Sequence, residues 1–333
     1  MRPHRSIASV FLLLPLCVAQ AASSPASILE EGRSLTRAFY KADVDGIWTR
    51  LSPATQAAMR SPERLQAFIE SLLKDYGRET RVLDEKTDAV AGTARYLRIA
   101  RFEKGKGPLE MPWNFDAWGK VTTIGIRVSP AEAASPHLTY KTKTELRLPF
   151  DGEWTVWWGG RTVWQNFHAV SEDSRFATDF LVVKDGKPFS GDGTKNEDYY
   201  AFGRPVLAPG AGRVVASVDG VADATPGSFD NDADPYGNRV ILDHGDGEWS
   251  LLGHLKKGSV AVRVGMDVKA GDRIGQAGNS GRSLQPVLHY HLQDSSELIN
   301  SKGLPAVFRR YTADGKRVSQ GEPVRGQVVR PGE

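Results

Sequence analysis

The stretch that decides the fold runs from Gly278 to Leu292 and reads Gly-Asn-Ser-Gly-Arg-Ser-Leu-Gln-Pro-Val-Leu-His-Tyr-His-Leu. It opens with residues typical of a tight turn and ends in an apolar segment that contains two histidines. Because side chains alternate along a strand, His289 and His291 face the same side. Buried polar side chains need partners, and a zinc ion satisfies two imidazoles and a carboxylate together. The stretch therefore predicts a strand that carries part of a metal site.

The residues around this stretch are typical of an all-β region. Eighteen of the 34 glycines lie between Gly186 and Gly281, where they separate short apolar runs such as 238–242. Short strands joined by closely spaced glycine turns indicate a mainly antiparallel sandwich or roll. We expect this mainly-β region to span 140–310 and to be followed by a C-terminal tail at 311–333.

Five of the seven histidines lie in this β region: His168, His244, His254, His289 and His291. A lone histidine is more often a surface residue than a ligand. His168, however, precedes an apolar segment that contains Asp179, and His254 follows directly on another apolar run. The single cysteine, Cys17, excludes an internal disulfide framework and a cysteine-rich zinc site. Histidine, aspartate or glutamate must therefore hold any metal.

Several short motifs follow one another in this region: Asn166-x-His168, Arg175-Phe176-Ala177-x-Asp179-Phe180, Gly237-Asn238-x-Val240-Ile241-x-x-His244, His254-Leu255 and Gly278-Asn279-Ser280-Gly281. Together they resemble the lysostaphin-type (LytM-like) zinc metalloendopeptidases, which cut peptide bridges of bacterial cell-wall peptidoglycan. The resemblance covers roughly residues 140 to 300. It implies a Zn²⁺ ion bound by His168, Asp179 and His289, with His254 as a catalytic residue beside the metal-bound water.

The last motif departs from the pattern of that family. The family pattern ends in Pro-His-Leu-His, in which the first histidine is catalytic and the second binds zinc. Counting from Gly281 places Pro286 on the proline and Val287 on the catalytic histidine. A second register pairs His289 with His291. In the first register His291 is a candidate catalytic residue in place of the missing histidine. Glycine turns fix strand register, so we favour the first register, in which valine replaces the catalytic histidine.

The N-terminal half has a different periodicity. Apolar residues recur at helical spacing from Ile28 to Tyr76, and Ser61-Pro62 is typical of a helix start. The segments 94–102 and 120–128 then alternate as strands do. We expect a small α+β domain over 22–128. In outline it resembles the cone-shaped nuclear-transport-factor-like domains found ahead of exported enzymes.

A linker is expected at 129–139, because Ser129 to Pro136 is rich in small residues and bracketed by prolines. Beyond it, half of the eight tryptophans lie between Trp154 and Trp164. They indicate either a strand with an aromatic core face, which we favour, or a surface on which glycans stack.

The first 21 residues are typical of a secretory signal peptide, with a basic head, an apolar run and small residues up to Ala21. The run is too short for a comfortable membrane-spanning helix, and no second long apolar run follows. We expect an exported protein, periplasmic or secreted, with no membrane span after cleavage. The 43 basic and 40 acidic residues give a net charge of only +3, so nucleic acid is not an expected partner.

Two functions follow from the resemblance. The first is a zinc-dependent endopeptidase that hydrolyses peptide cross-links of peptidoglycan, with peptidoglycan peptides as its substrate. The alternative is a degenerate, catalytically impaired member that binds the cell wall or activates a cell-wall amidase. The retained ligand set His168, Asp179 and His289 favours the enzyme, whereas Val287 favours the regulatory module.

Overall fold

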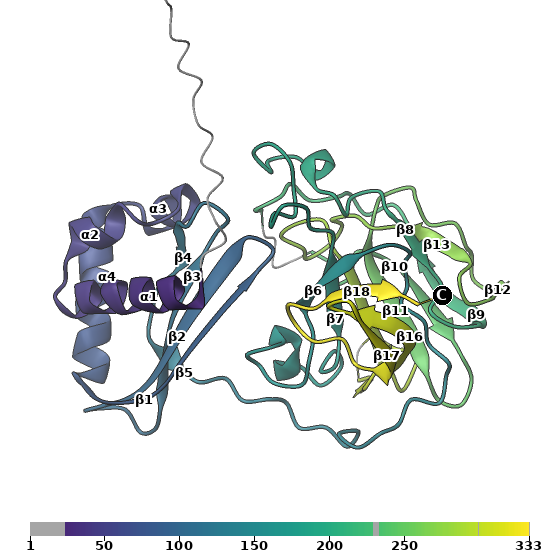
Figure 1. Ribbon diagram of the computed structural model, residues 1–333, viewed down its shortest axis with the longest axis horizontal. Helices are drawn as coiled ribbons and strands as arrows, with labels where there is room; N and C mark the ends of the chain where they lie inside the picture. The colour runs from purple at the N-terminus through teal and green to yellow at the C-terminus, as the bar shows by residue number, and fades with distance from the viewer. Residues whose placement is uncertain (1–23, 229–232, 299, 333) are drawn as a thin grey trace, which may run out of the picture.

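The computed structural model describes residues 24–228, 233–298 and 300–332 (Figure 1). The predicted signal peptide at 1–21 lies outside these residues. Among the described residues, no helix is long and apolar enough to cross a membrane.

Four helices open the described chain: α1 (Pro25–Tyr40), α2 (Val44–Trp48), α3 (Pro53–Met59) and α4 (Pro62–Tyr76). A serine caps the start of each of the three helices that begin at a proline, since its hydroxyl accepts a hydrogen bond from a backbone N–H of the first turn. The start expected at Ser61-Pro62 is thus confirmed. Gly77 ends α4 with a φ of 74°, a conformation that favours glycine.

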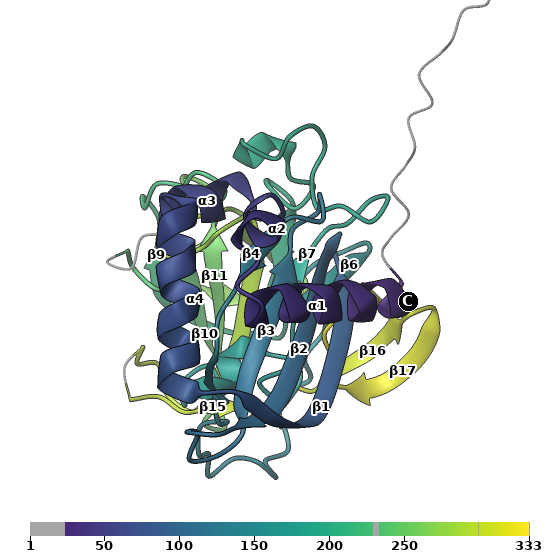
Figure 2. The ribbon, with the colours of Figure 1, turned by 90° about the vertical axis from the view of Figure 1, so that its left-hand side faces the viewer.

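An antiparallel five-stranded sheet follows, with strands β1 (Glu79–Val90), β2 (Thr93–Phe102), β3 (Leu109–Phe115), β4 (Val121–Thr123) and β5 (Arg127–Val128). Helices α1 and α4 cover one face of it (Figure 2). Phe39, Leu65, Tyr96 and Trp113 fill the space between the layers. The expected strand at 120–128 is divided into β4 and β5, which pair with opposite ends of β3. The helices-then-sheet order agrees with the sequence, and the nuclear-transport-factor-like assignment stays a prediction.

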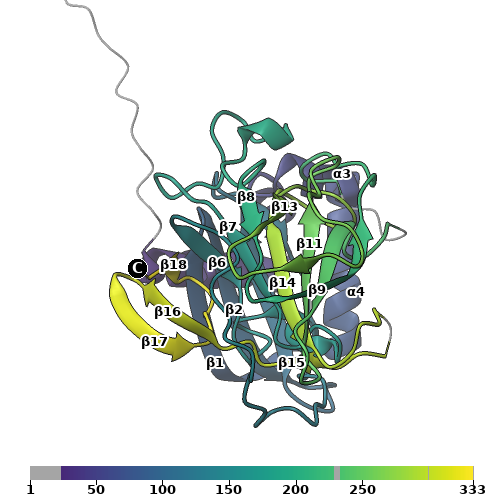
Figure 3. The same ribbon diagram turned by 90° about the vertical axis from the view of Figure 1, so that its right-hand side faces the viewer.

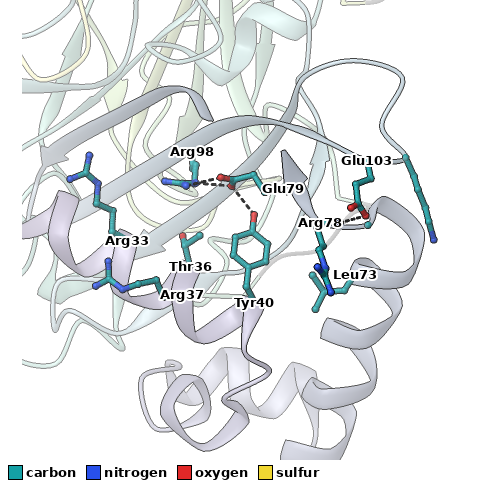
Figure 4. Close-up of a pocket in the computed structure, with 11 residues that line it drawn as sticks. Arg33, Thr36, Arg37, Tyr40, Leu73, Arg78, Glu79, Arg98 and Glu103 are labelled. Atoms are coloured by element: carbon teal, nitrogen blue, oxygen red, sulfur yellow. Dashed lines mark hydrogen bonds and ion pairs between the residues drawn. The ribbon is translucent and has the colours of Figure 1, made fainter. Parts of the chain in front are cut away.

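A cavity of about 960 Å³ opens between α1, the end of α4 and the first two strands (Figure 4). At its floor Glu79 accepts hydrogen bonds from Tyr40 and Arg98. Arg98 and Arg33 both donate to Glu85 as well. Arg98 and Arg33, which line the cavity, are therefore each paired with a carboxylate.

The β region forms a large antiparallel sheet of eleven strands, and a further two-stranded sheet packs with it. The large sheet has the order β12-β9-β10-β11-β14-β7-β6-β18-β16-β17, and β15 pairs with β14. Its strands are β6 (Trp154–Trp158), β7 (Thr178–Leu181), β9 (Gly212–Val218), β10 (Asn238–Asp243), β11 (Trp249–Leu255), β12 (Asp267–Val268), β14 (Leu288–Gln293), β15 (Gly303–Leu304), β16 (Phe308–Ala313), β17 (Lys316–Gly321) and β18 (Val328–Pro331). The small sheet consists of β8 (Pro205–Leu207) and β13 (Arg273–Gln276). Two single-turn 3₁₀ helices, η1 (Phe167–Val170) and η2 (Asn196–Asp198), complete the region, which is mainly β as expected.

The C-terminal residues form strands, whereas the sequence was expected to end in a tail at 311–333. Strands β16, β17 and β18 add to the sheet beyond β6 (Figure 3). Phe308, Tyr311 and Val329 are buried in the main core, and this burial stabilises the C-terminal segment as part of the sheet. The boundary expected at 310 therefore falls inside β16.

The N-terminal sheet contacts the β region through the β1–β2 hairpin. Val90 and Ala91 at its tip pack against Leu181 of β7 and against Val287. Residues 129–139, the expected linker, contain no helix or strand.

Arginines from the two regions cover the tryptophan-rich segment. The guanidinium of Arg95 lies over Trp164, with 4.1 Å between its carbon and the ring centroid. That of Arg325 lies 4.2 Å from the ring centroid of Trp158. Trp154, unlike Trp158 and Trp164, is fully buried in the core, where it stacks on Phe150. The expected aromatic core face thus holds for Trp154, and the others lie against cations at the contact between the regions.

Candidate metal centre

Strands β7 and β14 bring an aspartate and a histidine face to face. In their antiparallel register Asp179 is the direct partner of His289, so the two side chains leave the sheet on the same side. Nδ1 of His289 lies 2.8 Å from one carboxylate oxygen of Asp179. Both side chains are buried, His289 almost completely.

His168 reaches the same carboxylate from the short helix η1. Its Nε2 lies 3.0 Å from the second oxygen of Asp179. Asn166, which is fully buried, fixes the start of η1, since its side-chain oxygen accepts from the backbone N–H of His168. The Asn166 amide nitrogen donates to the carbonyl oxygens of Gly160 and Ala177 and so ties η1 to the residues ahead of β7. The Asn-x-His motif therefore has a structural reason.

These three side chains fit a zinc ion. One ligand atom from each of His168, Asp179 and His289 lies within 4.8 Å of the others. Two imidazole nitrogens and one carboxylate oxygen are a donor set that zinc prefers. Burial acts to raise the pKa of Asp179, but the neighbouring His168 and His289 outweigh it and hold that pKa below its usual range. Zinc held by three protein ligands keeps one position open and acts there as a Lewis acid.

His254 lies beside this cluster at the end of β11. Its ring centroid is 5.7 Å from that of His289, and its φ of 56° is unusual for a residue other than glycine. Nδ1 lies 2.8 Å from the carbonyl oxygen of Ser280, so Nδ1 carries the proton and donates. Burial, together with the neighbouring His289, lowers the pKa of His254 to about 4. At neutral pH the ring is therefore uncharged, and Nε2 is a proton acceptor.

The turn at 278–281 holds His254 in this position. The Ser280 hydroxyl donates to the carbonyl of Leu255 and accepts from the backbone N–H of Asn238. Gly237 and Gly281 approach so closely that a Cβ on either would lie about 2.4 Å from the opposite backbone. The two glycines are thus required by the close approach of two loops.

Val287 lies just before β14, two residues ahead of His289. It pairs with Gly278 and packs against Leu181, Val90 and Ala91, and it is only 6% exposed. The surroundings of this valine are apolar. Its replacement of a catalytic histidine stays a prediction from the glycine-counted register.

His291, the second candidate for a catalytic residue, is not a member of the three-residue cluster. Its Nδ1 lies 2.9 Å from Nε2 of His289, and its own Nε2 lies 2.7 Å from the side-chain oxygen of Gln293. Its ring is 1% exposed.

The sequence-based reasoning missed two neighbours of the cluster. Gln293 continues the alternation of His289 and His291, and that period of two could have revealed it. The ring of Tyr236 lies 5.2 Å from that of His289, centroid to centroid, and its hydroxyl donates to Asp173. No pattern in the sequence links this tyrosine to the strand.

Residues 197–301 match the sequence profile of peptidase family M23. This match assigns the region 197–301 to peptidase family M23. This confirms the resemblance noted from the motifs. The matched range contains His254, His289 and His291, whereas His168 and Asp179 precede it in the chain.

Two curated proteins and one solved structure are similar to parts of this chain. Peptidoglycan DD-endopeptidase ShyA of Vibrio cholerae is 38% identical over 101 residues, which are 30% of this chain and 21% of that protein. Murein hydrolase activator EnvC of Escherichia coli is 35% identical over 65 residues, 20% of this chain and 15% of that protein. The catalytic domain of the antimicrobial peptidase lysostaphin from Staphylococcus simulans is 21% identical, with a TM-score of 0.27 over 45% of this chain and 86% of that one. The chain thus spans about a fifth or less of the length of these curated relatives.

Proposed function

We propose that the β region is a zinc-dependent endopeptidase that hydrolyses peptide cross-links of bacterial peptidoglycan. The observation that carries this proposal is the convergence of His168, Asp179 and His289 on one small volume beside His254. Export to the periplasm or beyond, through the signal peptide at 1–21, is part of the same proposal.

The roles of the individual residues follow from their surroundings. His168, Asp179 and His289 hold the ion. His254, uncharged at neutral pH with Nε2 as an acceptor, takes up a proton during peptide hydrolysis. The name of the Vibrio relative, a peptidoglycan DD-endopeptidase, supports peptidoglycan peptides as the substrate class.

The experiment combines metal analysis with digestion of cell wall. We expect the purified full chain to bind one zinc ion and to release soluble peptides from isolated peptidoglycan. His168→Ala should abolish both properties, whereas His244→Gln, which changes a histidine outside the cluster, should abolish neither. A wild-type protein that binds zinc and releases nothing would overturn the enzymatic proposal.

A second function is favoured by one observation, the apolar surroundings of Val287. If this valine stands where the family has its catalytic histidine, one general acid–base group is missing, and such groups contribute about 10²- to 10⁴-fold in rate. The region would then act as a module that binds the cell wall or activates an amidase, in line with the name of the E. coli relative.

The two functions are separated by adding a cell-wall amidase to the digestion. A regulatory module releases nothing alone and increases the release caused by the amidase. An endopeptidase releases peptides without the amidase, and its His168→Ala variant does not.

A further inference from the structure

Three alternate residues of β14 form a hydrogen-bonded row behind the metal cluster: His289, His291 and Gln293. Each is 1% exposed. The row begins at Nε2 of His289, the ring nitrogen that points away from Asp179, and ends at the side-chain amide of Gln293. The side-chain amide of Gln293 determines the direction of each hydrogen bond in this row.

The amide of Gln293 has only one orientation that satisfies its neighbours. Its nitrogen donates to the carbonyl oxygens of Ser295 and Glu297, at 2.7 and 3.2 Å. The reversed amide would place its oxygen against these two acceptors, and a buried acceptor without a donor is costly. The Gln293 oxygen therefore faces His291, and it accepts.

The orientation of Gln293 fixes which nitrogens of the two histidines carry protons. Nε2 of His291 must donate, because the Gln293 oxygen can only accept. A second proton would charge a fully buried ring that touches no carboxylate, so Nδ1 of His291 is the acceptor. Nε2 of His289 must then donate to it.

Nδ1 of His289, which lies 2.8 Å from a carboxylate oxygen of Asp179, is consequently the nitrogen left to face a cation. Without a metal it can bond the carboxylate only through a second proton, and a metal ion would take the place of that proton. This is the arrangement that a metal ligand requires, since a histidine binds a metal through one nitrogen and donates from the other.

We propose that His291 and Gln293 are positioning residues, which fix the tautomer and orientation of His289 so that its Nδ1 faces the metal. The hydrogen bonds of β14 support the assigned tautomer of His289. The effect of that tautomer on zinc binding rests on the proposed function. His291 thus has a role other than that of a catalytic residue.

A matched pair of variants tests the role of His291. In His291→Gln the new amide can accept from His289 and donate to Gln293, as the imidazole does, whereas His291→Leu can do neither. Loss of a partner behind a metal ligand lowers metal affinity by about 10- to 100-fold. We expect that loss for His291→Leu in competition with a chromophoric chelator, and a near-normal zinc affinity for His291→Gln. Equal affinities for wild type and His291→Leu, or equal losses in both variants, would overturn the proposal.

A second measurement does not depend on the variants or on zinc. The ¹⁵N NMR spectrum of the histidine side chains in metal-free wild type should show a proton on Nε2 of His289 at neutral pH. An Nε2 without a proton would contradict the proposal even if zinc binds. A wild type that binds no zinc would instead refute the proposed function, and the NMR result would still decide the tautomer. If His291→Leu does not fold, Gln293→Leu takes its place in the test. It should also lower the zinc affinity, because it removes the acceptor of the His291 proton.

Discussion

At the scale of single residues, the candidate site depends on how each polar group is satisfied. The resemblance to the lysostaphin-type family implied that His168, Asp179 and His289 would meet, and the structure brings them together. The sequence could not predict that the Gln293 amide turns its oxygen towards His291, since that depends on the two carbonyl groups that orient the amide. The same limit applies to Tyr236, which lies far from the strand in sequence and close to it in space.

Replacing the central carboxylate tests the ligand set. Asp179→Asn keeps the volume of the side chain but removes the charge that lies between His168 and His289. We expect zinc to be lost from the purified protein, as measured by mass spectrometry of the metal content. Asp173→Asn is the control: Asp173 is another aspartate of the region and is not a member of the cluster, so its replacement should leave the bound zinc in place. Full zinc content in Asp179→Asn would contradict the assignment.

The low pKa of His254 predicts how stability changes with pH. The pKa is about 4 in the folded metal-free chain, against an ordinary value of 6.5. The unfolded state therefore binds the proton more tightly, so the free energy of unfolding decreases as the pH drops from about 6.5 towards 4. Below pH 4 the titration of His254 causes no further decrease. The expected loss between pH 7 and pH 5 is about 2 kcal/mol.

Urea unfolding of metal-free protein at these two pH values measures that loss. His254→Gln carries no titrating ring at this position, so its stability should fall by about 2 kcal/mol less than that of wild type. Identical pH dependence in both proteins would show that His254 is not held uncharged by its surroundings.

At the scale of elements, the agreement between sequence and structure follows the strength of the local pattern. The helices with serine caps and the strand β2 have clear periodicity, and they form where the sequence predicts them. Strand β3 was not predicted, because its residues are buried on both sides and show no alternation. Strands β16 to β18 were not predicted because their few buried residues are separated by exposed charged ones.

One buried arginine joins the β1–β2 hairpin to the β region, in addition to the apolar contacts of Val90 and Ala91. Arg325 is 3% exposed in its side chain, donates to Asp88 of β1 and to the carbonyl of Trp157, and lies over Trp158. Arg325→Ala should lower the free energy of unfolding by about 3 kcal/mol, the lower end of the range for breaking a buried pair, because Asp88 keeps Arg95 as a partner.

Chemical denaturation of the variant measures this change. Arg37→Ala serves as the control, since Arg37 pairs with Glu30 on the surface and such pairs contribute about 0–1 kcal/mol. A loss below 1 kcal/mol for Arg325→Ala as well would mean that this contact does not hold the hairpin.

At the scale of the whole molecule, Val287 links the candidate metal centre to the N-terminal sheet. It lies two residues from His289 and also contacts the tip of the β1–β2 hairpin. The sequence identified Val287 as unusual, but it could not reveal that the turn of the β1–β2 hairpin, nearly 200 positions earlier, covers this residue. The apolar side chain at this position packs with the apolar tip of that hairpin.

Val287→His should therefore loosen the hairpin. An imidazole at this position would place a polar ring among Val90, Ala91 and Leu181, and a buried polar group without a hydrogen-bond partner costs about 1–3 kcal/mol. We expect faster amide hydrogen exchange at residues 88–93 in this variant and not in Val287→Ile. Unchanged exchange in Val287→His would show that the hairpin does not depend on an apolar residue here.

The central claim is that His168, Asp179 and His289 bind one zinc ion, with His289 ligating through Nδ1. A crystal structure of the zinc-loaded full chain, with anomalous data collected at the zinc absorption edge, tests it most directly. We predict one anomalous peak in contact with Nε2 of His168, the Asp179 carboxylate and Nδ1 of His289, while His291 stays bonded to Gln293. The absence of a peak at these atoms, or a peak bound by His291 in place of His289, would contradict the account.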